Sequence, residues 1–221
     1  MELCSKRLEA MGLSPRDIQV LTPTRKGLCG TAELNRRLQE ALNPPSPEKN
    51  EKQFGDFVFR EGDRVMQIKN NYDIMWRKAA GSSDITGRTK ASGMPDEAGA
   101  GIFNGDIGFI QTIDDDRETV TVDFDGRLVT YQYEQLSELE PAYAMTVHKS
   151  QGSEYRAVIL AAVPGAPQLL VRGVLYTAVT RARELLIIVG DRAVVERMTL
   201  DDRRQKRYSG LRARLAEGSA G

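Results

Sequence analysis

Three short apolar runs constrain the fold of this chain most strongly, because each has the length and composition of a strand that is buried on both faces. They are residues 17–21, 157–163 and 185–189. A helical pattern with Leu34, Leu38 and Leu42 on one face follows the first run, and residues 168–180 form a second helical pattern before the third run. Strands that alternate with helices predict an α/β fold with a parallel sheet.

The segment from Phe54 onward has a different pattern. Short apolar or alternating runs predict strands at residues 57–59, 64–68, 108–113, 119–124 and 128–131. Asp125-Gly126 is a tight hairpin turn signal between the last two runs. Short strands at such close spacing predict a small antiparallel barrel. We expect residues 1–53 and 141–221 to form the two parts of the sheet domain and residues 54–140 the barrel, with a mobile loop or extended hairpin at residues 75–101.

The composition of the 221 residues limits the function classes. The formal net charge is zero, so any binding of nucleic acid depends on a local patch and not on the overall field. Cys4 and Cys29 have no metal-ligand spacing, and we expect no metal site. No secretion signal and no apolar run of membrane-spanning length occur, which predicts a cytoplasmic protein without a membrane partner. The sequence also lacks G-x-x-x-x-G-K-[ST], the P-loop that cradles nucleotide phosphates.

The stretch of residues 142–155 contains His148, the only histidine of the chain. A lone histidine is often just a polar or core residue, but the neighbours of this one are hydrogen-bond donors that suit a phosphate or a base edge. The candidate DNA-binding residues are Thr146, His148, Lys149, Ser150 and Gln151. Pro141 suits the first position of a helix, so we expect a short helix that ends at Gly152 and presents its polar face at the rim of the sheet.

The sequence of residues 146–154, Thr-x-His-Lys-Ser-Gln-Gly-Ser-Glu, resembles the fifth signature motif of superfamily-one helicases, specifically of the RecD/TraA branch. In that family the motif grips single-stranded DNA and links it to the nucleotide pocket. The resemblance implies that Gly152 and Glu154 lie at the nucleotide, with Glu154 on its sugar.

Residues 175–183, Leu-Tyr-Thr-Ala-Val-Thr-Arg-Ala-Arg, resemble the sixth helicase motif, which implies that Arg181 is the catalytic arginine finger. Phosphoryl transfer builds charge on the γ-phosphate oxygens, and a planar cation from the facing domain neutralises it. The run 17–21 with the loop Thr-Pro-Thr-Arg-Lys-Gly resembles the fourth motif, which implies that Arg25 or Lys26 contacts the nucleotide phosphates. A solvated charge pair is the alternative for these two residues.

The phrases at residues 62–73 and 103–108 resemble the SH3-like barrel that this family inserts into its second RecA-like domain. We therefore expect a RecA-like parallel sheet domain without its own P-loop, interrupted by a small SH3-like antiparallel β-barrel. Asn70, Asn71 and Asn104 suit either turns or DNA contacts. Trp76 suits stacking on a base or packing under its own loop. The basic tail of residues 201–215 suits either a DNA contact or a solvated capping helix.

The resemblance implies the C-terminal motor part of an ATP-dependent, RecD-like DNA helicase (similar to the alpha subunit of exodeoxyribonuclease V) that moves 5′ to 3′ on single-stranded DNA. The expected cofactor is ATP with Mg²⁺, held mainly by an N-terminal RecA-like half that carries the P-loop. Without that half, we expect the chain to be inactive. Other expected partners are single-stranded DNA and recombination or repair subunits. Two alternatives remain open: a non-catalytic nucleic-acid-binding module, and the helicase half of a conjugative relaxase.

Overall fold

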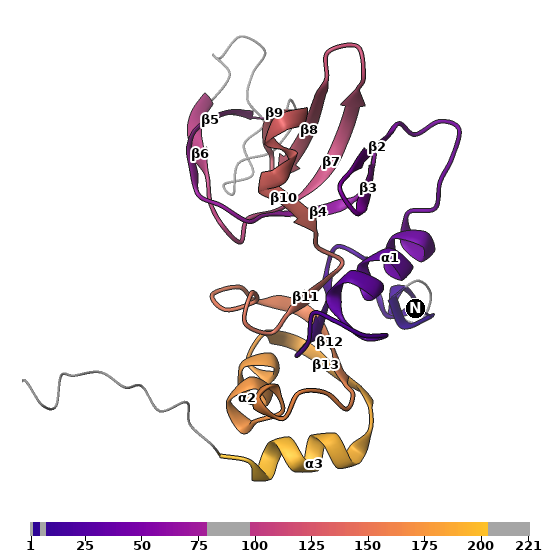
Figure 1. Ribbon diagram of the computed structural model, residues 1–221, viewed down its shortest axis with the longest axis vertical. Coiled ribbons are helices and arrows are strands. Elements are labelled where there is room, and N and C mark those ends of the chain that lie inside the picture. Colours follow the sequence, from indigo (N-terminus) through magenta and orange to yellow (C-terminus); the bar gives the residue numbers. More distant parts are fainter. Residues whose placement is uncertain (1, 5–7, 79–97, 203–221) are drawn as a thin grey trace, which may run out of the picture.

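A four-stranded parallel sheet forms one half of the computed structural model, which describes residues 2–4, 8–78 and 98–202 (Figure 1). The strand order is β11-β1-β12-β13, and all three pairings are parallel. The strands are β1 (Ile18–Thr22), β11 (Ala144–Thr146), β12 (Tyr155–Ala162) and β13 (Ala182–Gly190). The three apolar runs are thus confirmed as strands of one parallel sheet. Strand β11 was not predicted, because its three residues lie inside the segment that the sequence favours as a helix.

Helices cover both faces of this sheet, as a strand buried on both sides requires. Helix α1 (Thr31–Leu42) packs Leu38 against Val20 and Ile159 on one face. On the other face α2 (Arg172–Val179) and α3 (Arg192–Leu200) pack against the opposite side of β12. The predicted helix with Leu34, Leu38 and Leu42 is confirmed. The predicted helix at 168–180 is divided into a 3-10 turn, Pro167–Leu169, and α2.

The segment between β1 and β11 carries the antiparallel sheet that was expected as a barrel. Its strand order is β10-β4-β7-β8-β9-β5-β6, with a separate hairpin β2–β3 beside it. The strands are β2 (Glu51–Phe54), β3 (Phe57–Arg60), β4 (Arg64–Gln67), β5 (Asn71–Lys78), β6 (Ala98–Ile102), β7 (Ile107–Asp114), β8 (Thr119–Phe124), β9 (Arg127–Gln132) and β10 (Leu139–Pro141). Asp125 and Gly126 turn between β8 and β9 with φ values of 54° and 84°, which confirms the predicted turn.

Strands β5 and β6 agree with the extended hairpin, one of the two alternatives expected for residues 75–101, and not with a mobile loop at its two ends. Both ends of that range are paired in an antiparallel hairpin, with Arg77 opposite Ala98. Residues 79–97 lie outside the described part of the chain. Trp76 is half-buried and packs against Gly99, where a Cβ atom would lie 2.5 Å from the indole. The described contacts of Trp76 therefore correspond to packing inside the hairpin and not to a free stacking surface.

The expected helix from Pro141 to Gly152 is wrong. Pro141 ends β10, β11 follows, and residues 147–152 form consecutive turns. The chain has only eight residues, 147–154, to descend from the carboxyl end of β11 to the amino end of β12. Gly152, with a φ of 90°, takes a backbone conformation that does not continue a right-handed helix.

Asp63 lies buried where the barrel meets the parallel sheet domain. Its carboxylate accepts hydrogen bonds from Gln39 Nε2 and Asn43 Nδ2 of the α1 region, from the backbone N–H of Arg60, and from the hydroxyl of Tyr143, at 2.5, 2.7, 2.8 and 2.9 Å. Burial raises the pKa of the Asp63 carboxyl, although the hydrogen bonds oppose the shift. One side chain thus ties strand β4 to a helix and to the segment that enters β11.

Arg64, the next residue, makes a second connection in another direction. Its side chain is buried, and Nη1 donates to the carbonyl of Ile18 in β1 at 2.6 Å. Gln19 of β1 donates to the carbonyls of Ala142 and Tyr143 at 3.3 and 3.2 Å. The Arg64 bond holds the barrel against the first strand of the parallel sheet, and the Gln19 bonds hold the segment that leads from the barrel into β11.

We expect Tyr143→Phe to lower the free energy of unfolding by about 1.5–3 kcal/mol at neutral pH, because it removes a hydrogen bond to a buried carboxylate. The hydroxyl favours the charged form of Asp63, so its loss raises the already raised pKa further. The cost is therefore full above the folded-state pKa of Asp63 and shrinks as the pH falls through it. Tyr131→Phe is the control, since the Tyr131 hydroxyl donates to neutral Gln67 at 2.9 Å. Urea titrations between pH 4 and 8 would measure both variants, and equal pH dependence would contradict the assignment.

Candidate nucleic-acid interface and nucleotide edge

The turn of residues 147–152 starts at the carboxyl end of β11 and is fixed by its own hydrogen bonds. The Ser150 hydroxyl donates to the carbonyl of Val147 at 2.7 Å, and Thr146 Oγ1 accepts from the N–H of Lys149 at 3.4 Å. Ser150 has no exposed surface and Thr146 is 8% exposed. His148 and Gln151 are exposed instead. Of the five predicted DNA-binding side chains, Thr146 and Ser150 therefore shape the turn, and His148 and Gln151 face solvent.

A cleft of about 620 Å³ lies between this turn and the barrel, and we call it the barrel-side cleft. Its walls are Met66, Ile68, Asn104, Gly105 and Asp106 from the barrel, and His148, Lys149, Gln151, Gly152 and Ser153 from the turn. The structure thus brings together predicted residues that lie more than forty positions apart in the sequence, Asn104 and His148. Lys149 forms an ion pair with Glu140 of β10, which connects the turn to the edge of the barrel.

The other two candidate asparagines differ in what they do. Asn70 accepts a hydrogen bond from the N–H of Asn104 at 2.9 Å, so it supports the rim of the barrel-side cleft. Asn71 donates to Glu138 at 2.9 Å and accepts from the N–H of Ile74 at 3.0 Å. The side chain of Asn71 is occupied inside the barrel, which is the turn role that its sequence also suits.

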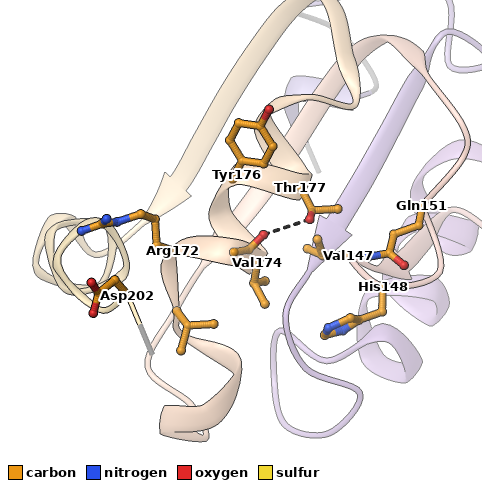
Figure 2. A pocket seen from close by; sticks show the side chains of 10 residues that line it. Val147, His148, Gln151, Arg172, Val174, Tyr176, Thr177 and Asp202 are labelled. Atoms are coloured by element: carbon orange, nitrogen blue, oxygen red, sulfur yellow. Dashed lines mark hydrogen bonds between the residues drawn. The ribbon is translucent and has the colours of Figure 1, made fainter. Parts of the chain in front are cut away.

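A second cavity of about 540 Å³ lies on the other side of the same turn, against α2 (Figure 2). We call it the α2-side pocket. It is lined by Val147, His148, Gln151, Val171, Arg172, Gly173, Val174, Tyr176, Thr177 and Asp202. The sequence did not predict this pocket. A signal was present in Tyr176, an aromatic residue on the polar side of a short helix, which is 68% exposed.

Arg181, the candidate arginine finger, lies between α2 and β13 at the amino end of the parallel sheet. Its guanidinium donates to the carbonyl of Ser153 at 2.8 Å, to the carbonyl of Thr177 at 3.3 Å and to the hydroxyl of Thr180 at 3.3 Å. A guanidinium has five N–H donors, so three bonds leave two for another acceptor. Arg181 is half-buried, and these three bonds hold its guanidinium in position.

Glu154, the candidate sugar contact, lies in the loop before β12 and directly follows Ser153, whose carbonyl accepts a hydrogen bond from Arg181. Its carboxylate pairs with Arg183 at 2.9 Å, and the two side chains are 52% and 65% exposed. An exposed ion pair of this kind contributes about 0–1 kcal/mol and is readily exchanged for another partner.

Arg25 and Lys26 lie elsewhere, in the loop after the carboxyl end of β1. Arg25 lines a cavity of about 230 Å³ together with Thr146 and Lys149. Arg181 precedes β13 at the opposite edge of the parallel sheet. The structure therefore does not bring Arg25 and Lys26 together with Arg181, and it places Arg25 beside the turn of residues 147–152. The resemblance of this loop to the fourth helicase motif could not predict that separation, because a sequence motif does not say at which end of the sheet its strand finishes.

We expect Gly152→Ala to destabilise the protein by about 1–2 kcal/mol, because its φ of 90° is strained for any residue with a Cβ atom. No atom lies within 4 Å of that Cβ, so the cost is conformational and not steric. Gly173→Ala is the control: it lies in α2, its Cβ also meets nothing, and it should stabilise by about 0.4–1 kcal/mol. Thermal unfolding would separate the two, and equal effects would contradict this explanation.

Two family models match this chain over the regions described above. Residues 34–124 match the SH3 domain of ATP-dependent RecD-like DNA helicases. Residues 141–189 match the UvrD-like helicase C-terminal domain. The second match contains the turn of residues 147–152, the α2-side pocket apart from Asp202, and Arg181.

Curated relatives have helicase names. The chain is 34% identical over 176 residues to the ATP-dependent RecD2 DNA helicase of Deinococcus radiodurans, an alignment that covers 80% of this chain and 20% of that protein. It is 37% identical over 123 residues to the RecBCD enzyme subunit RecD of Mycobacterium tuberculosis, covering 56% of this chain and 21% of that protein. The chain thus spans about a fifth of the length of these relatives.

Among solved structures, Pif1 helicase from Bacteroides in complex with ADP-AlF3 and single-stranded DNA matches with 19% identity and a TM-score of 0.47, covering 91% of this chain and 46% of that one. No helix among the described residues has the length and apolar character needed to span a membrane. The two domain matches and the named relatives show that this chain contains an SH3 domain of the RecD-like helicase type and a UvrD-like helicase C-terminal domain.

Proposed function

We propose that this chain is the C-terminal motor part of an ATP-dependent DNA helicase that moves 5′ to 3′ on single-stranded DNA. The observation that carries the proposal is the position of the turn of residues 147–152, which forms one wall of the barrel-side cleft and also reaches Arg181 through Ser153. A single segment of eight residues, 147–154, therefore connects a cleft for DNA with a candidate finger for the nucleotide.

The barrel-side cleft supports a grip on single-stranded DNA through hydrogen-bond donors. His148 and Gln151 are exposed in its wall, and Asn104 faces them from the barrel. Phosphate and sugar contacts position a strand without reading its sequence, as a translocating motor requires. Lys149 adds a cation that already has a partner, Glu140, so a phosphate would have to compete for it.

Arg181 supports the nucleotide part of the proposal. It is held at the amino end of β12 and β13 by the Ser153 and Thr177 carbonyls and the Thr180 hydroxyl, with two N–H donors left for a γ-phosphate. ATP with Mg²⁺ supplies the scissile phosphate, and a P-loop on another domain would hold most of it, because the 221 residues contain none. We expect the chain alone to hydrolyse no ATP. Glu154 would exchange Arg183 for the nucleotide sugar.

The proposal extends to partners and location. The RecD relatives are named as subunits of the RecBCD enzyme, so we include other recombination or repair subunits among the partners of this chain, and a cytoplasmic location. The two alternatives, a non-catalytic DNA-binding module and the helicase half of a relaxase, would use the same barrel-side cleft. Only loss of turnover in the finger variant below separates a motor from a binding module.

Arg181→Ala should lower the DNA-stimulated ATPase of the protein that joins this chain to a P-loop domain by about 10³–10⁵-fold, with nucleotide binding retained. Arg181→Lys should recover little, because an ammonium lacks the planar fork. Arg192→Ala is the control, since that arginine is 92% exposed on α3 and pairs with Glu196 of the same helix at 2.9 Å. Turnover that survives in Arg181→Ala would favour the binding-module alternative.

Lys149→Ala should weaken binding of single-stranded DNA and lower the slope of log Kd against log salt by about 0.7, the value for one phosphate contact on a single strand. Lys52→Ala is the matched control: this lysine lies over the ring of Tyr133, outside the cleft, with Nζ 3.8 Å from the ring centroid. Fluorescence anisotropy from 50 to 300 mM salt would measure both. A change of slope for Lys52 but not Lys149 would place the DNA elsewhere.

A further inference from the structure

The α2-side pocket has no role in the functions discussed above, although it shares a wall with the barrel-side cleft. We propose that it is a subsite for one nucleotide of a single-stranded nucleic acid, with the base stacked on Tyr176 and the phosphate next to Arg172. The assignment rests on the proposed binding of DNA by this chain and adds the place where the strand continues.

Continuity between the two cavities is the first observation. His148 and Gln151 line both of them, so the turn of residues 147–152 separates two neighbouring cavities and contributes side chains to each. Both side chains are exposed. A strand that lies in the barrel-side cleft meets these two residues and can continue over them into the α2-side pocket.

The lining of the pocket is suited to a base. Tyr176 is 68% exposed on α2, and the apolar side chains of Val147, Val171 and Val174 line the same pocket. An aromatic face over an apolar floor binds a base of any sequence by stacking. The volume of about 540 Å³ falls within the roughly 300–1,000 Å³ of small-ligand sites, so it holds one nucleotide.

The charges in the pocket orient that nucleotide. Arg172 is pinned to the last turn of α3, where Nε donates to the carbonyl of Thr199 at 2.8 Å, and its guanidinium supplies the cation for a phosphate. Asp202 lines the same side, away from His148 and Gln151 (Figure 2). A carboxylate repels phosphate but accepts hydrogen bonds from the amino groups of bases. The pocket therefore takes a nucleotide with its base inside and not a bare phosphate.

The test measures binding of the 221-residue chain to oligonucleotides in which one position at a time is abasic or carries 2-aminopurine. Tyr176→Ala should weaken binding of the intact strand by about 5- to 150-fold, the range for one stacked base. Tyr176→Phe should keep wild-type affinity, because the ring remains. Val179→Ala should also keep it, because Val179 is a 42% exposed residue of the same helix that does not line the pocket.

The abasic series distinguishes stacking from a general loss of structure. At one position an abasic nucleotide should weaken binding to the wild type but not to Tyr176→Ala, and 2-aminopurine there should be quenched only when Tyr176 or Phe is present. Equal losses in both proteins at every position would overturn the subsite. Release of that base by submillimolar dCMP would assign the pocket to a free nucleotide and overturn the assignment to a strand.

The outcomes for the subsite and for the proposed function are separable. Weaker binding in Lys149→Ala together with unchanged binding in Tyr176→Ala would overturn the subsite and leave the barrel-side cleft as the DNA site. A wild-type chain that binds none of the oligonucleotides would overturn both.

Discussion

The rest of the structure depends on two neighbouring buried residues, Asp63 and Arg64, which connect the barrel to the parallel sheet domain. Neighbouring side chains of an extended strand point in opposite directions, so one residue reaches α1 and Tyr143 while the next reaches Ile18 of β1. Neither side chain forms an ion pair with another described residue. Burying a carboxylate and a guanidinium in this way is costly, and their hydrogen bonds offset only part of that cost. In return the barrel is fixed on the parallel sheet, and the two walls of the barrel-side cleft keep their separation.

The turn of residues 147–152 depends on that fixed geometry. Its buried residues hold the backbone, and its exposed residues face cavities on two sides. Ser153, the next residue, lines the barrel-side cleft and accepts the hydrogen bond of Arg181. A shift of the turn in the barrel-side cleft therefore moves Ser153 and, through its carbonyl, the hydrogen bond that positions Arg181. In the function that we propose, this short path couples movement of the strand to nucleotide chemistry without a change in the sheet.

In the proposed DNA interface, charge contributes less than hydrogen bonding and ring contacts. The chain has no net charge, Lys149 is paired with Glu140, and Asp202 and Asp106 line the cavities. Electrostatic attraction alone would hold a strand weakly at physiological salt. In the proposed interface, donors such as Gln151 and an aromatic ring such as Tyr176 retain their contribution at that salt concentration, because neither depends on net charge or on base sequence. An interface of this composition is consistent with a strand that must be both held and released.

The sequence alone determined the fold class, because apolar periodicity distinguishes a strand buried on both faces from a strand with alternating burial. Its resemblance to known sequence motifs also predicted the family of the two domains. It did not determine which side chains are free. Thr146, Ser150 and Asn71 match the expected pattern for DNA contact, yet they are used inside turns, since their hydrogen-bond partners depend on local backbone shape. Strand direction separated Arg25 from Arg181, and packing of α2 beside the turn created the pocket around Tyr176. Such features arise from contacts between distant residues, which only the tertiary structure decides.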